Sequence, residues 1–197
     1  MSEPKTFILA ASGEADSYRR DLFEARIRAT VRYADPAAWM TATAVAFALA
    51  EFGDLLAQWR HEIGIIAISD LGPAESMTRM QTDATTGFSS PLHYAASSPG
   101  TLAGVSCIAF GLRGPTMNLT MAAREGVPVA LTLCAGWLGR KTARLMLVAT
   151  CRGNGSIPGL SRAVLLAPPG LLQSGKPLTE SAISWLAFSG REEGVQG

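Results

Sequence analysis

The sequence predicts an α/β protein in which a mainly parallel, five-stranded sheet is sandwiched between helices. The apolar runs at residues 63–68 and 145–149 are continuous and do not alternate with polar residues, which is typical of strands buried on both faces. Alanine-rich segments of helical length separate such runs along the chain. Strands that alternate with helices favour a parallel sheet covered on both sides.

Composition and charge limit the classes of protein to which the chain can belong. Its 197 residues are enough for one domain, and 48% of them are hydrophobic, which fits a buried core and excludes disorder. We therefore expect a single domain over residues 1–197, with a core from about 5 to 170 and a loosely attached C-terminal tail. A formal net charge of +1 attracts neither nucleic acid nor a membrane surface, so neither is expected as a partner.

The cysteines and histidines predict no metal and no cofactor. Cys107, Cys134 and Cys151 are odd in number and widely spaced, and only two histidines accompany them, which fits neither a disulfide framework nor a zinc site. Cys107 and Cys134 fall within apolar helices and should be inert, whereas Cys151 follows a strand and could be partly exposed. The apolar runs are too short for a signal peptide core or a membrane span, so we expect a reducing, cytoplasmic location.

The N-terminal quarter predicts one strand followed by helices. Residues 7–11 form an apolar strand that Ser12 and Gly13 end, and residues 16–26 carry apolar side chains at helical spacing. A short extended piece is expected at 29–33. Asp35 followed by Pro36 is typical of a helix N-cap and first helical position, so a long helix should run from there to Trp59, with a bend at Gly53.

The middle of the chain continues the alternation. After the buried strand at 63–68, residues 74–85 predict a helix and residues 87–99 a loop rich in serine and proline. Residues 100–112 predict an apolar helix of small residues, which Gly114 and Pro115 end. A strand is expected at 116–121.

The last third predicts a turn, a helix, two strands and a final short helix. The turn covers residues 122–126, and the helix at 127–138 should be buried and central, with Gly139 as its C-cap. Buried strands are expected at 143–150 and 162–167. Residues 176–190 contain a last short helix, and the end of the chain should be loose.

One segment resembles a known family. The run Ser90-Pro-Leu-His-Tyr-Ala-Ala96, the small-residue helix at 100–112 and the phrase Phe110-Gly-Leu-Arg-Gly-Pro115 follow each other as the parts of a β-ketoacyl synthase do. The resemblance is good over 89–151 and loose over 37–151. The chain is similar to the N-terminal half of the thiolase fold. It is especially similar to a short ketosynthase N-terminal-like subgroup, whose members are found near aryl-polyene and other polyketide pathways.

The resemblance implies a catalytic cysteine that this sequence lacks. In the family, the strand after Gly-Pro ends in a sharp turn that presents a cysteine, which takes an acyl chain from a carrier protein as a thioester. Counting from Pro115 puts that position at Ala123, give or take one or two residues, and its neighbours are Arg124 and Glu125. Because a carboxylate cannot form the stable thioester, we expect no catalytic residue in this turn.

Three functions remain open. The resemblance implies a non-condensing partner of an active ketosynthase, acting with an acyl-carrier protein in polyketide or fatty-acid-type metabolism, as a homodimer or heterodimer paired along residues 116–121. The alternative is an enzyme that uses the degenerate pocket for another acyl-thioester reaction such as decarboxylation, with Arg124, Glu125 and His93 to stabilise an enolate. The sequence disfavours this enzyme because the two histidines of the family's C-terminal half have no counterpart in it. A scaffold that only keeps the fold is the third possibility.

Overall fold

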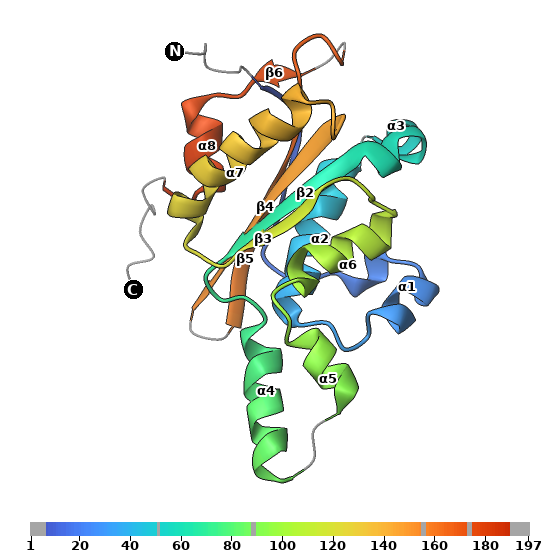
Figure 1. Cartoon of the computed structure of the whole chain (residues 1–197), viewed down its shortest axis with the longest axis vertical. Coiled ribbons are helices and arrows are strands. Elements are labelled where there is room, and N and C mark those ends of the chain that lie inside the picture. The colour runs from blue at the N-terminus through green and yellow to red at the C-terminus, as the bar shows by residue number, and fades with distance from the viewer. Residues whose placement is uncertain (1–6, 51, 88–89, 155–156, 173–174, 190–197) are drawn as a thin grey trace.

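One six-stranded sheet runs through the molecule, with helices packed on both of its faces (Figure 1). The computed structural model describes residues 7–50, 52–87, 90–154, 157–172 and 175–189. The α/β class with helices on both sides of the sheet is therefore confirmed. Of the C-terminal tail that was predicted to be loosely attached, residues 190–197 fall outside this description, whereas the helix Glu180–Leu186 packs against the sheet through Leu186.

The order of the strands in the sheet is β3-β2-β4-β5-β1-β6. β2 pairs in parallel with β3 and β4, and β1 points the same way as β4 because both are antiparallel to β5. β6 is a short antiparallel edge on β1. The strands are β1 (Ile8–Ala15), β2 (Ile63–Ser69), β3 (Thr116–Leu119), β4 (Leu145–Asn154), β5 (Ile157–Ala167) and β6 (Lys176–Pro177).

The sheet is therefore mixed, and the prediction of five mainly parallel strands has to be corrected at β5 and β6. Only two positions separate Asn154 at the end of β4 from Ile157 at the start of β5. A parallel connection needs a crossover of about a dozen residues, so a link this short can only make an antiparallel hairpin. The sequence pattern could not show this because a strand buried on both faces has the same composition in either direction.

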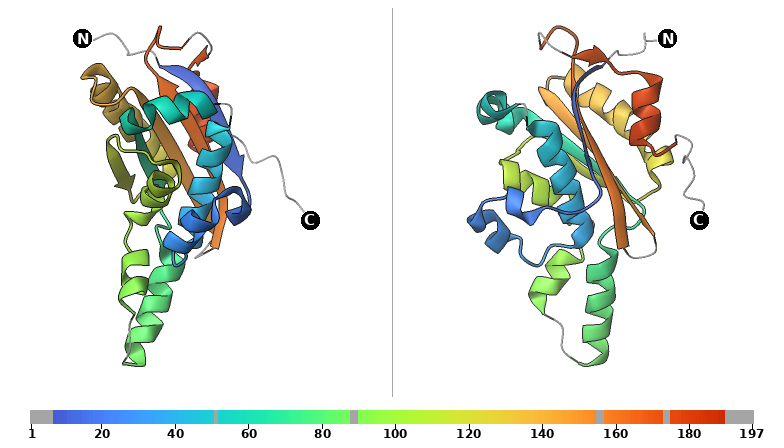
Figure 2. Two further views of the ribbon diagram at one scale, coloured as in Figure 1. Left: turned by 90° about the vertical axis from the view of Figure 1, so that its right-hand side faces the viewer. Right: turned by 180° about the vertical axis from the view of Figure 1, so that it is seen from behind.

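The helices agree with the sequence pattern except near the N-terminus, before α6, and at residues 49–53, where the single helix predicted from Pro36 to Trp59 is divided into α2 and α3. They are α1 (Ala25–Thr30), α2 (Pro36–Leu49), α3 (Gly53–Trp59), α4 (Ala74–Thr85), α5 (Pro91–Ala96), α6 (Thr101–Phe110), α7 (Ala123–Gly139) and α8 (Glu180–Leu186), with single 3-10 turns at Arg20–Leu22 and Arg60–Glu62. Figure 2 shows that α4 and α5 extend away from the sheet at one end of the molecule.

Three predictions near the N-terminus were wrong. Residues 16–26 do not form one helix but hold a bend, the 3-10 turn at Arg20–Leu22 and the start of α1. The first strand does not end at Ser12 and Gly13, because β1 continues to Ala15 alongside β5. The piece at 29–33 is the end of α1 and a turn, not an extended segment. The predicted loop at 87–99 contains α5, whose first turn is capped by the Ser90 hydroxyl, which accepts from the Leu92 N–H.

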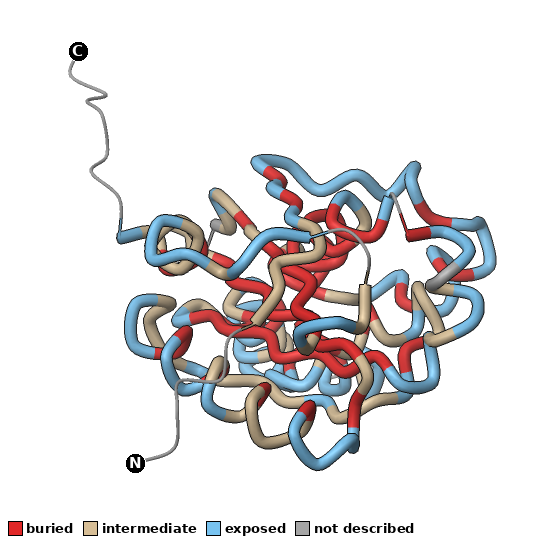
Figure 3. The backbone as a smooth tube through the Cα atoms, turned by 90° about the horizontal axis from the view of Figure 1, so that it is seen from above, coloured by how far each residue is buried: buried red, intermediate tan, exposed pale blue. Residues whose placement is uncertain are grey.

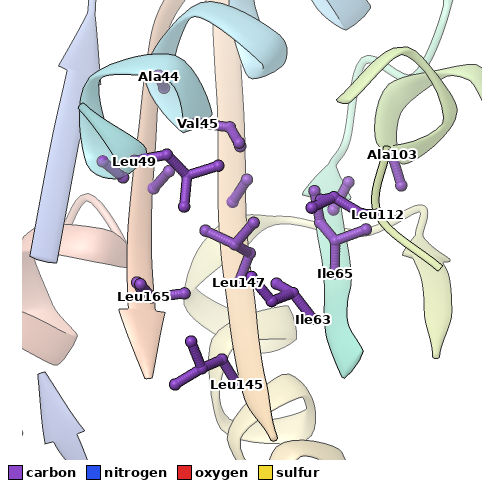
Figure 4. Packing of buried hydrophobic residues seen from close by; sticks show 14 of the residues in the cluster. Ala44, Val45, Leu49, Ile63, Ile65, Ala103, Leu112, Leu145, Leu147 and Leu165 are labelled. Carbon is purple, nitrogen blue, oxygen red and sulfur yellow. The ribbon is translucent and has the colours of Figure 1, made fainter. Parts of the chain in front are cut away.

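The two largest clusters of buried residues lie on opposite faces of the sheet, and Figure 3 shows the buried segments gathered in the middle of the molecule. α2 and α6 cover one face, where Leu49 belongs to the same cluster as Leu147 and Ile65 (Figure 4). α7 and α8 cover the other, where Val127 packs with Ile68. All residues of β2 are buried, as its continuous apolar run predicted, and each such leucine or isoleucine stabilises the fold by roughly 1.5–3 kcal/mol.

α7 is buried on one side only, which corrects the prediction of a buried central helix. Its buried residues include Val127, Ala130, Cys134 and Leu138, which lie at helical spacing on the side facing the sheet. Val129, on another side of the helix, is 43% exposed. No charged residue occurs from 126 to 139, so the outward side of α7 is an uncharged surface.

Asp35 holds the start of two helices. Its Oδ1 accepts from the Ala37 N–H at 2.9 Å, which is the predicted cap of α2. Its Oδ2 accepts from the Ser76 N–H at 2.8 Å, in the first turn of α4. Because the carboxylate is only 2% exposed, these two hydrogen bonds replace its contacts with water and fix α4 to α2.

The Phe110–Pro115 phrase is a turn that joins α6 to the sheet. Gly111 has φ +66°, the left-handed conformation that ends a helix, and the Leu112 N–H donates back to the Cys107 carbonyl. The Gly114 N–H donates to the Ile63 carbonyl at 3.0 Å, so the turn is bonded to the start of β2. The most specific part of the family resemblance is thus a structural connection.

Replacing Gly114 with alanine should destabilise the protein by about 3 kcal/mol, because the added Cβ overpacks the turn. That Cβ would lie 2.5 Å from the Ile63 carbonyl carbon and 2.6 Å from the Gly64 nitrogen, both backbone atoms. Denaturant unfolding measures the change. Gly104→Ala in α6 is the matched control, since its Cβ meets nothing within 4 Å. Equal stability of the two variants would contradict the proposed close approach.

Candidate functional site

A cavity of about 430 Å³ lies at the carboxyl ends of the parallel strands. Asp70 follows β2, Ala122 and Ala123 join β3 to α7, and Cys151 and Arg152 belong to β4. Ligands of open α/β sheets bind outside the carboxyl ends of the strands, because the loops there meet at one edge. This cavity is therefore the candidate functional site of the chain.

The last wall of the cavity comes from the C-terminal part of the chain. Ala187, Phe188 and Ser189 follow α8 and line it. Phe188 has φ +54°, and its ring lies against two guanidinium groups, that of Arg152 at 4.9 Å and that of Arg162 at 4.6 Å. Cation–π contacts of this kind hold the segment after α8 against β4 and β5.

Arg162 is itself fixed in several directions. Its Nε donates to a Glu14 carboxylate oxygen at 2.6 Å, and its Nη1 donates to the Trp185 carbonyl at 2.6 Å. The guanidinium also lies 4.9 Å from the Trp185 ring. Together with Phe188 these contacts form a clamp that joins α8 to β1 and β5.

The predicted nucleophile turn is the first turn of α7. The helix begins at Ala123 and not at Val127, and its N-cap residue, Ala122, offers no side chain to the free N–H groups. The Arg124 and Glu125 side chains are 76% and 61% exposed and form a 3.5 Å ion pair with each other. The position that the family resemblance assigns to the nucleophile therefore carries a methyl group at a helix N-terminus.

The native thiols are poor nucleophiles. Cys151 lines the cavity but is 2% exposed, where the sequence left partial exposure open, and burial raises its pKa to about 12. Burial likewise raises the pKa of Cys134 to about 12, and the pKa of Cys107 is also raised by burial. Since only the thiolate attacks, these cysteines carry almost none of the reactive form near pH 7.

His93 lies on α5, outside the residues that line this cavity. Its Nδ1 lies 2.9 Å from an Asp83 carboxylate oxygen on α4, and its ring packs edge-on against Tyr33 with centroids 5.6 Å apart. The structure therefore does not bring His93 together with Arg124 and Glu125, which the decarboxylation alternative requires.

Sequence reasoning missed Asp70, Arg152 and Phe188. Asp70 and Arg152 lie at the carboxyl ends of predicted strands, a signal that could have found them once β2 and β4 were taken as parallel neighbours. Phe188 had no such signal. Within the described residues no cluster of three or more metal-ligating side chains occurs, and no helix is long and apolar enough to cross a membrane.

Solved structures share the fold of this chain. The ishigamide ketosynthase/chain length factor matches with a TM-score of 0.69 at 13% identity, over 88% of this chain and 64% of that one. AntDE:AntF, a type II polyketide synthase acyl-carrier protein in complex with its ketosynthase, matches with a TM-score of 0.69 at 13% identity, over 89% and 66%. The chain has a ketosynthase-like thiolase fold.

A further ketosynthase-like match is ApeO in complex with its chain length factor ApeC from Xenorhabdus doucetiae. Its TM-score is 0.55 at 16% identity, over 82% of this chain and 72% of that one. The ketosynthase-like chain spans less than two-thirds of the first two structures, at 64% and 66%. No protein-family model matches it, and no curated protein matches it significantly. At identities of 13% and 16% the likeness concerns the fold alone.

Replacing Phe188 with alanine should loosen the segment after α8. The clamp loses the ring that both guanidinium groups contact, and we expect amide hydrogen exchange at residues 187–189 to become at least about tenfold faster. Hydrogen–deuterium exchange followed by mass spectrometry measures the rate. Phe188→Tyr keeps the ring and is the control. Unchanged exchange in Phe188→Ala would show that these two contacts do not hold the segment after α8.

Proposed function

We propose that this chain is a non-condensing, ketosynthase-like subunit that pairs with an active ketosynthase as a chain-length-type partner in polyketide or fatty-acid-type metabolism. The observation that carries the proposal is the start of α7, where Ala122 and Ala123 stand in the place of the nucleophile turn. The fold is that of ketosynthases, and solved relatives of this fold include ketosynthases with chain length factors. A chain that has the ketosynthase fold but lacks the nucleophilic thiol is better suited to be the partner of a ketosynthase than to be a condensing enzyme itself.

Residual acyl-thioester chemistry is the less favoured candidate. Enolate stabilisation needs donors preorganised around the reacting oxygen and shielded from water. Arg124 and Glu125 are mostly exposed and neutralise each other, and His93 is paired with Asp83. No arrangement of these three side chains points at a common oxygen, so nothing in the cavity favours decarboxylation.

Two surfaces support pairing. β3 lies at the edge of the sheet and pairs only with β2, so its outer backbone groups are available to a strand of another chain. Met117 and Leu119 on β3 are half-buried against the α7 side of the core. The uncharged outward side of α7, with Val129 43% exposed, lies on the same face of the sheet as these side chains. A partner that extends the sheet at β3 would also cover part of α7.

Light scattering during size-exclusion chromatography tests the proposal. The full chain is run alone and after mixing with a ketosynthase from the same host, and we expect a homodimer or a one-to-one heterodimer. Val129→Arg places a charge on the outward side of α7 and should weaken pairing at least about tenfold, because an unpaired charge is costly to bury. Thr85→Arg, at the exposed end of α4, is the control and should pair normally.

A 20.7 kDa monomer that stays monomeric at high concentration and binds no ketosynthase would defeat the proposal. Pairing that Val129→Arg leaves unchanged would show that the partner binds another surface. Circular dichroism confirms that the variant is folded, which separates a lost interface from a lost fold.

A further inference from the structure

A second cavity lies on the opposite face of the sheet from α7. It has a volume of about 320 Å³, is open to solvent on one side, and is bordered by α1, α5, α6 and the turn after α1, which lie next to one another in Figure 1. It shares no lining residue with the cavity at the start of α7. The residues that matter below are Val31, Tyr33, Leu92, Thr101, Gly104 and Ile108.

The lining carries no charged side chain. Two of its hydroxyls are already committed, since Thr30 donates to the Arg26 carbonyl at 2.9 Å and Thr101 donates to the Ser98 carbonyl at 2.8 Å. Leu92 and Ile108 are 50% and 46% exposed and form apolar walls that face water. The cavity therefore offers apolar contact and little that would compensate a buried charge.

Gly104 keeps the cavity open on the α6 side. A Cβ at this position would meet nothing within 4 Å, so close packing within the chain does not require glycine. Its backbone is helical and not left-handed, so conformation does not require it either. Glycine within a helix is destabilising relative to alanine. The absence of a side chain at Gly104 leaves space in the cavity.

The opposite wall is fixed in place. The Tyr33 ring is covered by the Arg32 guanidinium at 4.6 Å and touched edge-on by His93. His93 is in turn held by Asp83 at 2.9 Å. These contacts link α5 to α4 and to the turn after α1. The cavity is thus formed without a ligand, as small-molecule sites usually are.

We propose that this cavity binds a small, uncharged, apolar molecule, a single ring system or a short alkyl chain. A volume of about 320 Å³ is at the lower end of the range of roughly 300–1,000 Å³ typical of ligand sites, and is too small for a helix of another protein. The absence of charge in the lining excludes phosphorylated and carboxylated ligands. This inference does not depend on the proposed pairing with a ketosynthase.

Photolabelling of the full chain with 3-trifluoromethyl-3-phenyldiazirine, an uncharged apolar ring, tests the site. We expect saturable labelling that maps by peptide mass spectrometry to the segments containing Tyr33 and Ile108. Gly104→Leu fills the cavity and should lower labelling of these segments at least tenfold. Gly53→Leu is the matched control, because a Cβ there also meets nothing within 4 Å and Gly53 lies outside the cavity. It should label like the native chain.

Three outcomes would overturn the site: labelling that does not saturate, labelling concentrated on α7, and equal labelling in Gly104→Leu and the native chain. Thermal unfolding shows whether Gly104→Leu is folded. If it is not, Gly104→Ala, which adds one methyl group to the cavity, takes its place and should lower labelling about threefold. The position of the labelled segments in the native chain tests the site without the need for either variant.

Discussion

Incubation of the purified chain with an acyl-carrier protein and a malonyl-carrier protein is expected to give no condensation product. The start of α7 carries Ala122 and Ala123, and neither side chain can form a thioester. Cys151, which lines the same cavity, is buried with a pKa raised to about 12. Intact mass spectrometry should therefore also show no acylation, whereas an active ketosynthase in parallel gives both the acyl-enzyme and the product.

Ala123→Cys tests whether the start of α7 could activate a thiol. The first turn of a helix lowers the pKa of a cysteine through its free N–H groups and positive end. We expect this variant to react with iodoacetamide at pH 7 about tenfold faster than Gly139→Cys, which places an exposed thiol at the other end of the same helix. Stable acylation of a native cysteine, or condensation by the unmodified chain, would contradict the non-condensing proposal.

Asp35→Ala should lower the free energy of unfolding by about 3 kcal/mol. The substitution removes the N-cap of α2 and the bond to the Ser76 N–H, and each loss leaves a buried donor without a partner, at a cost of about 1–2 kcal/mol. For a domain of this size, such a change lowers the melting temperature by about 6–12 °C. Calorimetry or denaturant unfolding measures it.

Asp35→Asn separates the two roles. The asparagine carbonyl can still accept from the Ala37 N–H, but its NH₂ group would face the Ser76 N–H, another donor. We expect roughly half of the alanine effect, with faster amide exchange in α4 and unchanged exchange in the first turn of α2. Equal stability of Asp35→Ala and the native chain would show that the carboxylate does not hold these helices.

Local signals in the sequence determined several features that the structure confirms. The continuous run of β2 predicted a strand buried on both faces, and every residue of that strand is buried. Asp35 and Pro36 predicted the start of α2 within one residue. These predictions succeeded because periodicity, capping and turn chemistry depend on residues that are neighbours along the chain.

Features that depend on distant contacts were not accessible in the same way. Ser12 and Gly13 predicted the end of the first strand, yet β1 extends to Ala15 because it pairs along β5, which lies near the other end of the chain. The antiparallel direction of β5 follows from the short link after Asn154. Local helix or strand propensity is a weak signal where a segment can pair with a sheet. Pairing gives hydrogen-bond partners to many backbone N–H and C=O groups at once.

The candidate site divides in the same way. The sequence alone determined what is missing from it, since no cysteine occurs between Cys107 and Cys134, the stretch that contains Ala123. Only the tertiary structure decided where the other groups lie: Cys151 is buried against α2, Phe188 is held by two arginines as a wall, and His93 is engaged with Asp83 away from the cavity. The absence of a residue type can be read from the chain directly, whereas a cavity is made by residues far apart in sequence that only the packing of the sheet and its helices brings together.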